Sequence, residues 1–343
     1  MKRFTILSFI LILGLMGCQK NKDAKESSEI TLTLGAYTVP KEVYEKEIIP
    51  AFHAYWYEKT NQNVKFEESY IASGAQSRAI LGGFEADIAA LSLEKDVERL
   101  REAGLITHNW KDRPHNGFVT HSVVIIAFRE GNPKNIRGWL DLSYPGMSVL
   151  YPNPKTSGGA MWDVLAIYGA GLKHSELQSG SPDQDAAKQL LKSIQRNVKV
   201  MDKSGRASVT TFENGVGDAI ITYENEVLLR RKQGRDFPYV IPEATMLIEN
   251  PIAIIDRNVD KHNNREVAEA FVDFLLSPSS QRFFARYGFR PVDREVAAEF
   301  AQTYPQPKYL FDVAYLGGWN RVFDSIFGSS GIWTIIMEEL AHE

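Results

Sequence analysis

The stretch Asn153-Pro154-Lys155-Thr156-Ser157-Gly158-Gly159-Ala160 is the most informative part of this chain. It lies between an apolar run at residues 147–151, which predicts a strand, and a helical run at residues 162–172. Backbone N–H groups in a helix's first turn have no partner inside the helix, and they point outward with the positive end of its dipole. Glycines let a ligand approach the main chain without a Cβ in the way. The stretch therefore predicts an anion-binding turn.

Three more strand-to-helix junctions have the same character. They are Tyr-Thr-Val-Pro at 37–40, Ile-Ala-Ser-Gly at 71–74 and Ser-Gly-Arg-Ala-Ser at 204–208. Ser, Thr and Gly are ordinary N-cap residues, so any single junction is more often a plain helix cap than a ligand site. In an open α/β sheet, however, such junctions meet at the carboxyl edge of the strands, where ligands bind. We therefore treat the four junctions as one candidate site.

Strand-like and helix-like runs alternate along almost all of the chain. This alternation predicts α/β layers with mostly parallel sheets, and 343 residues favour two lobes over one sheet. We expect residues 30–120 and 250–343 to form lobe I and residues 121–249 to form lobe II. The apolar runs at 118–128 and 250–255 are expected to hold the hinge strands between the lobes.

The N-terminus predicts export and lipid attachment. Lys2 and Arg3 precede an apolar run at residues 4–16 that is too short to span a membrane, so residues 1–17 are typical of a signal peptide. Leu15-Met16-Gly17-Cys18 resembles the lipobox of bacterial lipoproteins. We expect lipidation at Cys18, a flexible tether at residues 18–29, and a position in the cell envelope, either periplasmic or on the outer face of a membrane.

Composition narrows the functional class. The chain has 39 basic and 43 acidic residues, a net charge of −4, which argues against a nucleic-acid partner. A single cysteine rules out an intramolecular disulfide, so stability must come from the hydrophobic core. The seven histidines are scattered without metal-ligand spacing, and no nucleophile elbow or phosphate-binding loop occurs. We therefore expect no enzyme activity, no metal and no cofactor.

At these motifs the chain resembles the sulfate-binding proteins of bacterial ABC importers. The 153–160 stretch is close to that family's most recognisable phrase, and the segments 202–212 and 217–226 resemble two others. Phe-Arg-Pro at 289–291 and Gly-Gly-Trp at 317–319 match phrases near the family's C-terminus. The resemblance implies a two-lobe, type II periplasmic-binding-protein fold with the ligand in the cleft. It also implies a monomeric lipoprotein that delivers sulfate, or thiosulfate, to permease and ATPase subunits.

The resemblance also implies a set of neutral ligand contacts. Thr38 falls where the family has an aspartate that donates its backbone N–H, and Gly205 where it has an alanine that does the same. Arg206 matches an arginine placed behind the site. The implied sulfate contacts are Thr38, Ser73, Ser157, Gly158, Gly159, Gly205 and Tyr223.

Tyr223 departs from the family, which has a tryptophan there. An indole only donates, whereas a phenol donates or accepts, so Tyr223 could replace the donor, admit a protonated oxyanion, or be a buried core residue. None of the implied contacts is acidic, which favours a fully deprotonated ion such as sulfate over phosphate, although Asp202 and Glu224 lie near in sequence. The alternative function is a surface lipoprotein of the same fold that binds another tetrahedral oxyanion or a macromolecule.

Overall fold

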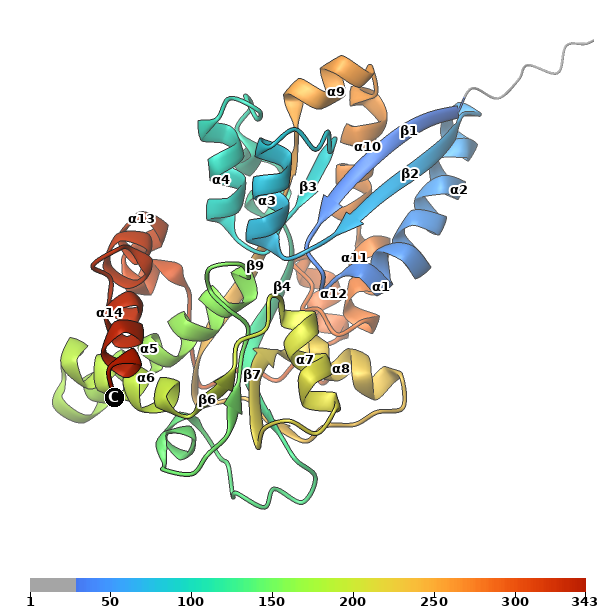
Figure 1. Cartoon of the computed structure of the whole chain (residues 1–343). Coiled ribbons are helices and arrows are strands. Elements are labelled where there is room, and N and C mark those ends of the chain that lie inside the picture. The colour runs from blue at the N-terminus through green and yellow to red at the C-terminus, as the bar shows by residue number, and fades with distance from the viewer. Residues whose placement is uncertain (1–28) are drawn as a thin grey trace, which may run out of the picture.

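The computed structural model describes residues 29–343. The predicted signal peptide, Cys18 and nearly all of the predicted tether lie outside the described residues. The strands follow the order β2-β1-β3-β9-β4-β7-β5-β6, with β10 beside β9 and β8 beside β4. Helices cover both faces of this mixed sheet, which divides into two lobes joined by β4 and β9 (Figure 1). Among residues 29–343, no helix has the length and apolar character that a membrane span requires.

Lobe I is built on three parallel strands: β1 (Glu29–Ala36), β2 (Asn63–Tyr70) and β3 (Ile88–Ala90). Alternate residues face opposite layers: Ile88 and Ala90 join the core beneath α2 and α10, while Ala89 joins the core beneath α3 and α4. Pro50 lies in the first turn of α2, directly after a π-helical turn, where its missing N–H costs no helix bond. The helices of lobe I are α1 (Lys41–Val43), η1 (Tyr44–Ile48), α2 (Ile49–Thr60), α3 (Ser73–Leu81), α4 (Glu94–Glu102), α9 (Asp256–His262), α10 (Arg265–Leu275) and α11 (Pro278–Arg286).

Lobe II is built on β5 (Val149–Leu150), which runs parallel to both β6 (Val198–Val200) and β7 (Ala219–Tyr223). Helix α5 (Gly158–Ser179) is apolar on all sides and largely buried, which is typical of a helix at the centre of a domain. It begins four residues before the predicted run because the Gly-Gly pair forms its first turn. The other helices here are α6 (Gln184–Arg196), α7 (Gly205–Glu213) and α8 (Glu224–Lys232).

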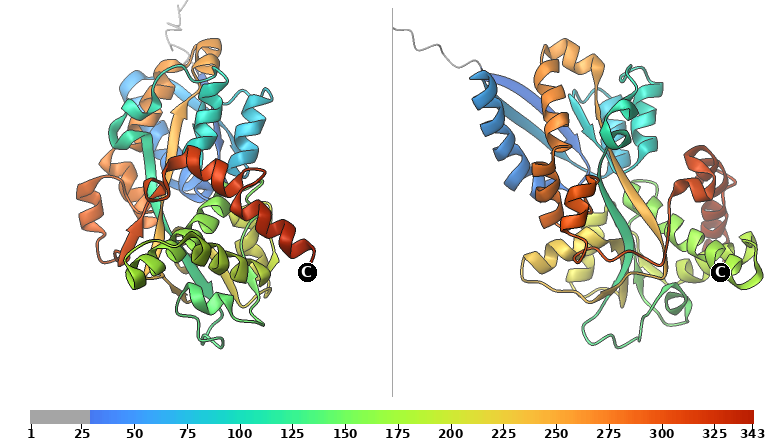
Figure 2. Two further views of the ribbon diagram at one scale, coloured as in Figure 1. Left: turned by 90° about the vertical axis from the view of Figure 1, so that its left-hand side faces the viewer. Right: turned by 180° about the vertical axis from the view of Figure 1, so that it is seen from behind.

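Two long strands cross between the lobes. β4 (Phe118–Phe128) and β9 (Ala244–Ile254) pair antiparallel with each other, β9 continues against β3 in lobe I, and β4 continues against β7 in lobe II (Figure 2). The predicted lobe limits at residues 120 and 250 lie inside these strands. Their buried polar side chains are paired: Thr120 donates to Asn250 Oδ1 at 3.1 Å, and Thr245 donates to the Val124 carbonyl at 2.6 Å.

The C-terminal segment does not stay with lobe I, and here the structure differs from the predicted division. Helix α14 (Ile332–Ala341) packs on α6, with Lys192 Nζ 2.8 Å from Glu339 Oε2 and Trp333 Nε1 3.2 Å from Tyr151 Oη. Buried Trp333 and Ile336 supply the apolar contact. The remaining elements are η2 (Trp110–Asp112), η3 (Pro114–Gly117), η4 (Trp139–Ser143), β8 (Tyr239–Val240), α12 (Arg294–Glu299), β10 (Tyr309–Phe311), η5 (Val313–Leu316), α13 (Gly318–Val322) and η6 (Phe323–Phe327).

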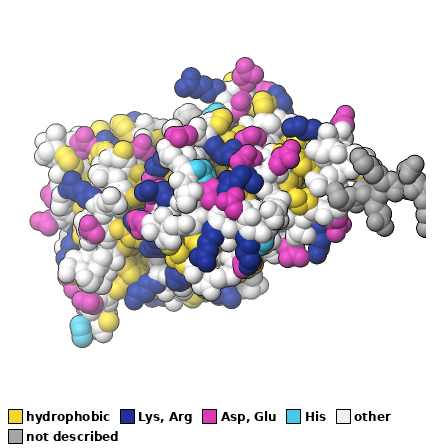
Figure 3. Space-filling model, turned by 90° about the horizontal axis from the view of Figure 1, so that it is seen from above, with side chains coloured by type: hydrophobic (Ala, Val, Ile, Leu, Met, Phe, Trp, Pro, Cys, Tyr) yellow, Lys and Arg dark blue, Asp and Glu magenta, His cyan; other side chains and the backbone are white. Residues whose placement is uncertain are grey.

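Charges of both signs mix on the surface. On the face shown in Figure 3, Lys and Arg side chains lie among Asp and Glu rather than gathering in one field. That face therefore offers no basic patch of the kind that holds a nucleic acid.

Candidate functional site

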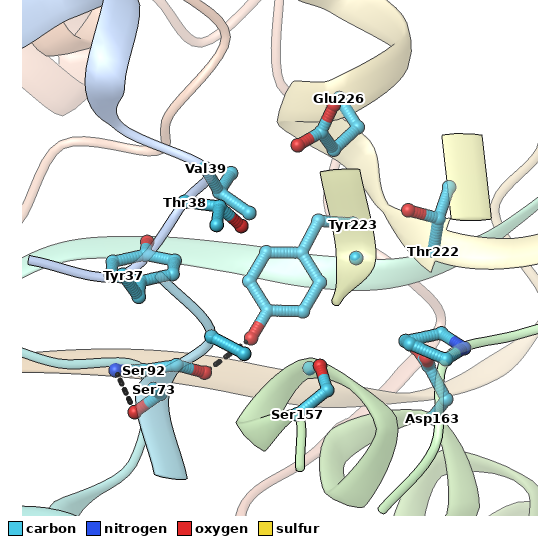
Figure 4. Close-up of a pocket in the computed structure, with 14 residues that line it drawn as sticks. Tyr37, Thr38, Val39, Ser73, Ser92, Ser157, Asp163, Thr222, Tyr223 and Glu226 are labelled. Atoms are coloured by element: carbon cyan, nitrogen blue, oxygen red, sulfur yellow. Dashed lines mark hydrogen bonds between the residues drawn. The ribbon is translucent and has the colours of Figure 1, made fainter. Parts of the chain in front are cut away.

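A small pocket lies where the strand-to-helix junctions of both lobes meet (Figure 4). Three helices begin at this pocket: α3 at Ser73 from lobe I, and α5 at Gly158 and α7 at Gly205 from lobe II. The four junctions predicted from sequence are thus brought together. The lining residues are Tyr37, Thr38, Val39, Ala72, Ser73, Ser92, Pro152, Ser157, Gly159, Asp163, Gly205, Thr222, Tyr223 and Glu226.

Serine caps shape two of these helix starts. Ser157 Oγ accepts from the Ala160 N–H at 3.4 Å, and Ser204 Oγ accepts from the Ala207 N–H at 3.2 Å. Each cap satisfies one N–H of the first turn, and the earlier N–H groups have no partner within their helix. Two positive helix ends from one lobe therefore meet a third from the other lobe at the same pocket.

Among the predicted contacts, only Gly158 does not line the pocket. It is buried at the first position of α5, where an added Cβ would lie 2.9 Å from Leu93 Cγ and 3.0 Å from Ser92 Oγ. Gly158 therefore allows α5 to approach lobe I closely. Gly205 is different, because the nearest atom to an added Cβ there is Val39 Cγ2 at 3.9 Å.

The hydroxyl of Ser73 is already engaged. It donates to Asp96 Oδ2 at 2.6 Å and accepts from the Ser92 N–H at 2.9 Å. Burial raises the pKa of Asp96, while the Ser73 hydrogen bond and the Arg99 guanidinium oppose that rise. Ser73 therefore presents its backbone N–H, at the start of α3, to the pocket rather than its hydroxyl hydrogen.

Tyr223 ends β7 and reaches across the cleft. Its Oη lies 2.6 Å from Ser92 Oγ, which belongs to lobe I (Figure 4). Burial raises the pKa of the Tyr223 phenol well above its usual value, so the side chain is neutral. Tyr223 is buried, and it is also part of the pocket wall. The side chain is therefore a buried residue that can also contact a ligand.

Sequence reasoning missed Ser92 and Tyr37. Ser92 lies between the buried strand β3, which ends at Ala90, and α4, which makes it a fifth junction of the same kind. Tyr37 follows β1, and its buried Oη has no hydrogen-bond partner among the described residues. In both cases the signal was a polar group at the end of an apolar strand.

Arg206 does not line the pocket, and its hydrogen bonds connect the two lobes. It donates to Glu226 Oε1 at 3.1 Å within lobe II, and to the Val39 carbonyl at 3.1 Å and Glu42 Oε2 at 3.0 Å in lobe I. No Lys, Arg or His side chain lines the pocket itself.

Two carboxyl groups line the pocket, neither of which the sequence analysis named. Glu226 is paired with Arg206 and Arg230. Asp163 has no such partner, and its sequence signal was the one charge inside an apolar helical run.

The two acids that the sequence analysis did name point elsewhere. Asp202 accepts from Ser208 at 3.2 Å and Thr211 at 3.1 Å, and Glu224 pairs with Arg290 at 2.7 and 3.0 Å. Neither lines the pocket. Among residues 29–343, no group of His, Cys, Asp and Glu side chains could hold a metal ion.

A pocket between two lobes, at which neutral hydrogen-bond donors and several helix N-termini meet, is typical of receptors for small anions. The family of bacterial extracellular solute-binding proteins matches residues 32–290. This chain belongs to that family. A sulfate-binding protein of Synechococcus elongatus is 40% identical over 97% of this chain and 93% of the relative. A thiosulfate-binding protein of Pseudomonas aeruginosa is 33% identical over 87% of this chain and 89% of the relative.

Solved structures of solute-binding proteins agree with the fold. The sulfate-binding protein SubI from Mycobacterium tuberculosis superposes with a TM-score of 0.78 at 37% identity, covering 85% of this chain and 98% of SubI. The periplasmic binding protein AfuA from Actinobacillus pleuropneumoniae superposes with a TM-score of 0.58 at 18% identity, covering 92% and 97%. The predicted α/β, two-lobe type II fold is confirmed.

Proposed function

We propose that this protein captures sulfate outside the cytoplasm and delivers it to the permease and ATPase subunits of an ABC importer. The observation that carries the proposal is the pocket where three helix starts from two lobes converge with no basic side chain in the wall. Relatives named sulfate-binding proteins, 36–40% identical over most of the chain, support it.

The donor set suits an ion that only accepts hydrogen bonds. Transferring an unpaired ion into a protein costs on the order of tens of kcal/mol. Charge-assisted hydrogen bonds contribute about 1.5–3 kcal/mol each, and each helix end adds about 0.3–2 kcal/mol. Backbone N–H groups at Thr38, Ser73, Gly159 and Gly205, with the hydroxyls of Ser157 and Tyr223, would offset the transfer without a salt bridge. Binding then stays reversible, as delivery requires.

The proposal includes a lipid anchor at Cys18 and a monomeric receptor. The apolar N-terminal run that ends in Gly17-Cys18 supports the anchor. A receptor held at a membrane surface by its N-terminus can present the cleft between its lobes to a permease. Labelling of expressed protein with a radioactive fatty acid, compared with Cys18→Ala, tests the anchor.

Thiosulfate is the second candidate ligand, because two relatives named thiosulfate-binding proteins are 33% identical to this chain. The test is titration calorimetry of the purified protein in sulfate-free buffer against sulfate, thiosulfate and phosphate. We expect sulfate to bind with phosphate failing to compete. A protein that releases no heat with sulfate, and that shows no shift in melting temperature, would refute the proposal.

A further inference from the structure

Asp163 is a buried carboxyl group without a partner. It lies in α5, is 1% exposed, and lines the pocket at the lobe interface (Figure 4). Its Oδ1 is fully buried and makes no hydrogen bond to any described residue. A buried ionised carboxylate without a partner is strongly disfavoured, so such a group is retained as the neutral acid or finds a donor in a ligand.

The groups that face Asp163 do not compensate a negative charge. Two phenols lie near it: Tyr223 at the end of β7 and Tyr151 after β5. The other carboxyl group in the pocket wall, Glu226, is itself acidic and is held by arginines outside the pocket. Burial accordingly raises the pKa of Asp163 well above its ordinary value.

We propose that Asp163 acts as the neutral acid and donates a hydrogen bond to the bound oxyanion, so that sulfate binding requires one proton on the protein. This inference rests on the proposed function, because it specifies how the same pocket holds a dianion. An ionised Asp163 would place a third negative charge beside the sulfate. A protonated Asp163 instead adds a neutral donor to the backbone N–H groups of the helix starts.

The proton requirement gives the pH dependence a definite sign. Sulfate stabilises the protonated form, so the pKa of Asp163 rises further on binding. Affinity is therefore constant while Asp163 is protonated in the free protein. Above that pKa the dissociation constant rises about tenfold per pH unit, with uptake of one proton per sulfate.

The experiment compares the wild-type protein with Asp163→Asn, whose amide N–H can donate in the same place but cannot titrate. Asp202→Asn is the matched control, since Asp202 lies in the same lobe but outside the pocket. Infrared difference spectra with and without sulfate report the carbonyl stretch of a protonated carboxyl. Calorimetry from pH 5 to 9 in buffers of different ionisation enthalpy reports affinity and proton uptake.

We expect a protonated-carboxyl band that shifts when sulfate is added, that is absent in Asp163→Asn and that remains in Asp202→Asn. Asp163→Asn should bind sulfate within about threefold of wild type at low pH, and its affinity should not fall as the pH rises. Tenfold tighter sulfate binding by Asp163→Asn at low pH, where wild-type affinity no longer changes with pH, would overturn the inference, because it would reveal an ionised, repelling carboxylate. The inference would also be overturned if the wild-type protein bound hydrogen phosphate and Asp163→Asn did not. If neither protein binds sulfate, the proposed function itself fails.

Discussion

A contact between two hydroxyl groups links the lobes at the pocket. Ser92 Oγ and Tyr223 Oη lie 2.6 Å apart, and both groups are buried. One of the two hydroxyls donates to the other, so the second retains its hydrogen for a ligand. At the scale of single residues, ligand binding therefore depends on which of the two hydroxyls has a hydrogen left to donate.

Replacing Tyr223 tests this donor. Tyr223→Phe should weaken sulfate binding about tenfold, because one hydrogen bond to a charged ligand contributes about 1.5–3 kcal/mol. Tyr223→Trp should retain binding, since the indole N–H donates from the same wall. Titration calorimetry measures both, with Tyr168→Phe on α5, outside the pocket, as control. Unchanged binding by Tyr223→Phe would make Tyr223 a core residue only.

A carboxylate at the cap of α5 tests the placement of the ion. Ser157→Asp should fold normally because aspartate is a good N-cap. It should weaken sulfate binding more than about a thousandfold, since unit charges ~4 Å apart at a protein surface interact by about 4 kcal/mol. Ser277→Asp, at the cap of α11, is the control and should bind as wild type. Normal sulfate binding by Ser157→Asp would show that the ion lies elsewhere.

The sequence predicted the pocket's main chain better than its side chains. Junctions at Ser73, Ser157 and Gly205 could be found because strand ends and helix starts are local signals. Asp163 could not, because its place in the wall depends on how α5 lies against β7, which is a tertiary contact. The engagement of the Ser73 hydroxyl by Asp96 is likewise a long-range contact, 23 residues apart.

At the scale of elements, two glycines that look equivalent in sequence differ in their surroundings. Gly158 lets α5 meet lobe I, whereas Gly205 has open space beside it. Neither has a positive φ, so space alone separates them.

Alanine at these two positions should therefore have opposite outcomes. Gly158→Ala should lower sulfate affinity at least about tenfold and reduce the melting temperature, because its Cβ would clash with Leu93 and Ser92 across the cleft. Gly205→Ala should bind within about twofold of wild type, because the backbone N–H remains. Calorimetry and thermal unfolding measure both variants. Equal effects of the two would contradict a close lobe contact at Gly158.

The Ser157 and Ser204 caps begin α5 and α7 at two of the predicted junctions. Both helices start ahead of their apolar runs, because the capped glycines form the first turn. The packing of α14 on α6 could not be read from the chain, because an amphipathic C-terminal helix fits either lobe equally well.

At the scale of the whole molecule, polar contacts join segments that lie far apart in the sequence. Arg206 spans the cleft behind the pocket without touching it. Asp256 joins the start of α9 to the segment that follows α4 in lobe I.

Removing Arg206 should affect binding from a distance. Arg206→Gln should lower sulfate affinity about tenfold, mainly through faster release, because the ties to Glu42 and the Val39 carbonyl are lost while the helix starts remain. Stopped-flow fluorescence measures release. Arg196→Gln, which removes a surface pair with Glu343, is the control and should have no effect. A release rate equal to wild type would refute the role of Arg206 in closure.

Acid sensitivity should come from Asp256. Burial raises its pKa, but hydrogen bonds from the Thr107 N–H, the His108 ring and Arg265 outweigh this and hold the pKa well below its usual value. Stability from Asp256 is therefore present above its unfolded pKa of about 3.9 and is lost as pH falls below it. Asp256→Asn should be less stable than wild type at pH 6, with the difference narrowing towards pH 3. Urea unfolding measures this, and the exposed Asp273→Asn should show no such gap.

In the proposed receptor, the two crossing strands would determine what an importer can sense. β4 and β9 span 11 residues each and are hydrogen-bonded to one another, so the lobes share a ribbon rather than two loose linkers. In the proposed receptor, this ribbon would be the hinge about which the two lobes open and close. The distance between a surface patch on one lobe and a patch on the other would then depend on whether the cleft holds an anion. A permease that touches both patches can therefore recognise a loaded receptor without any access to the anion.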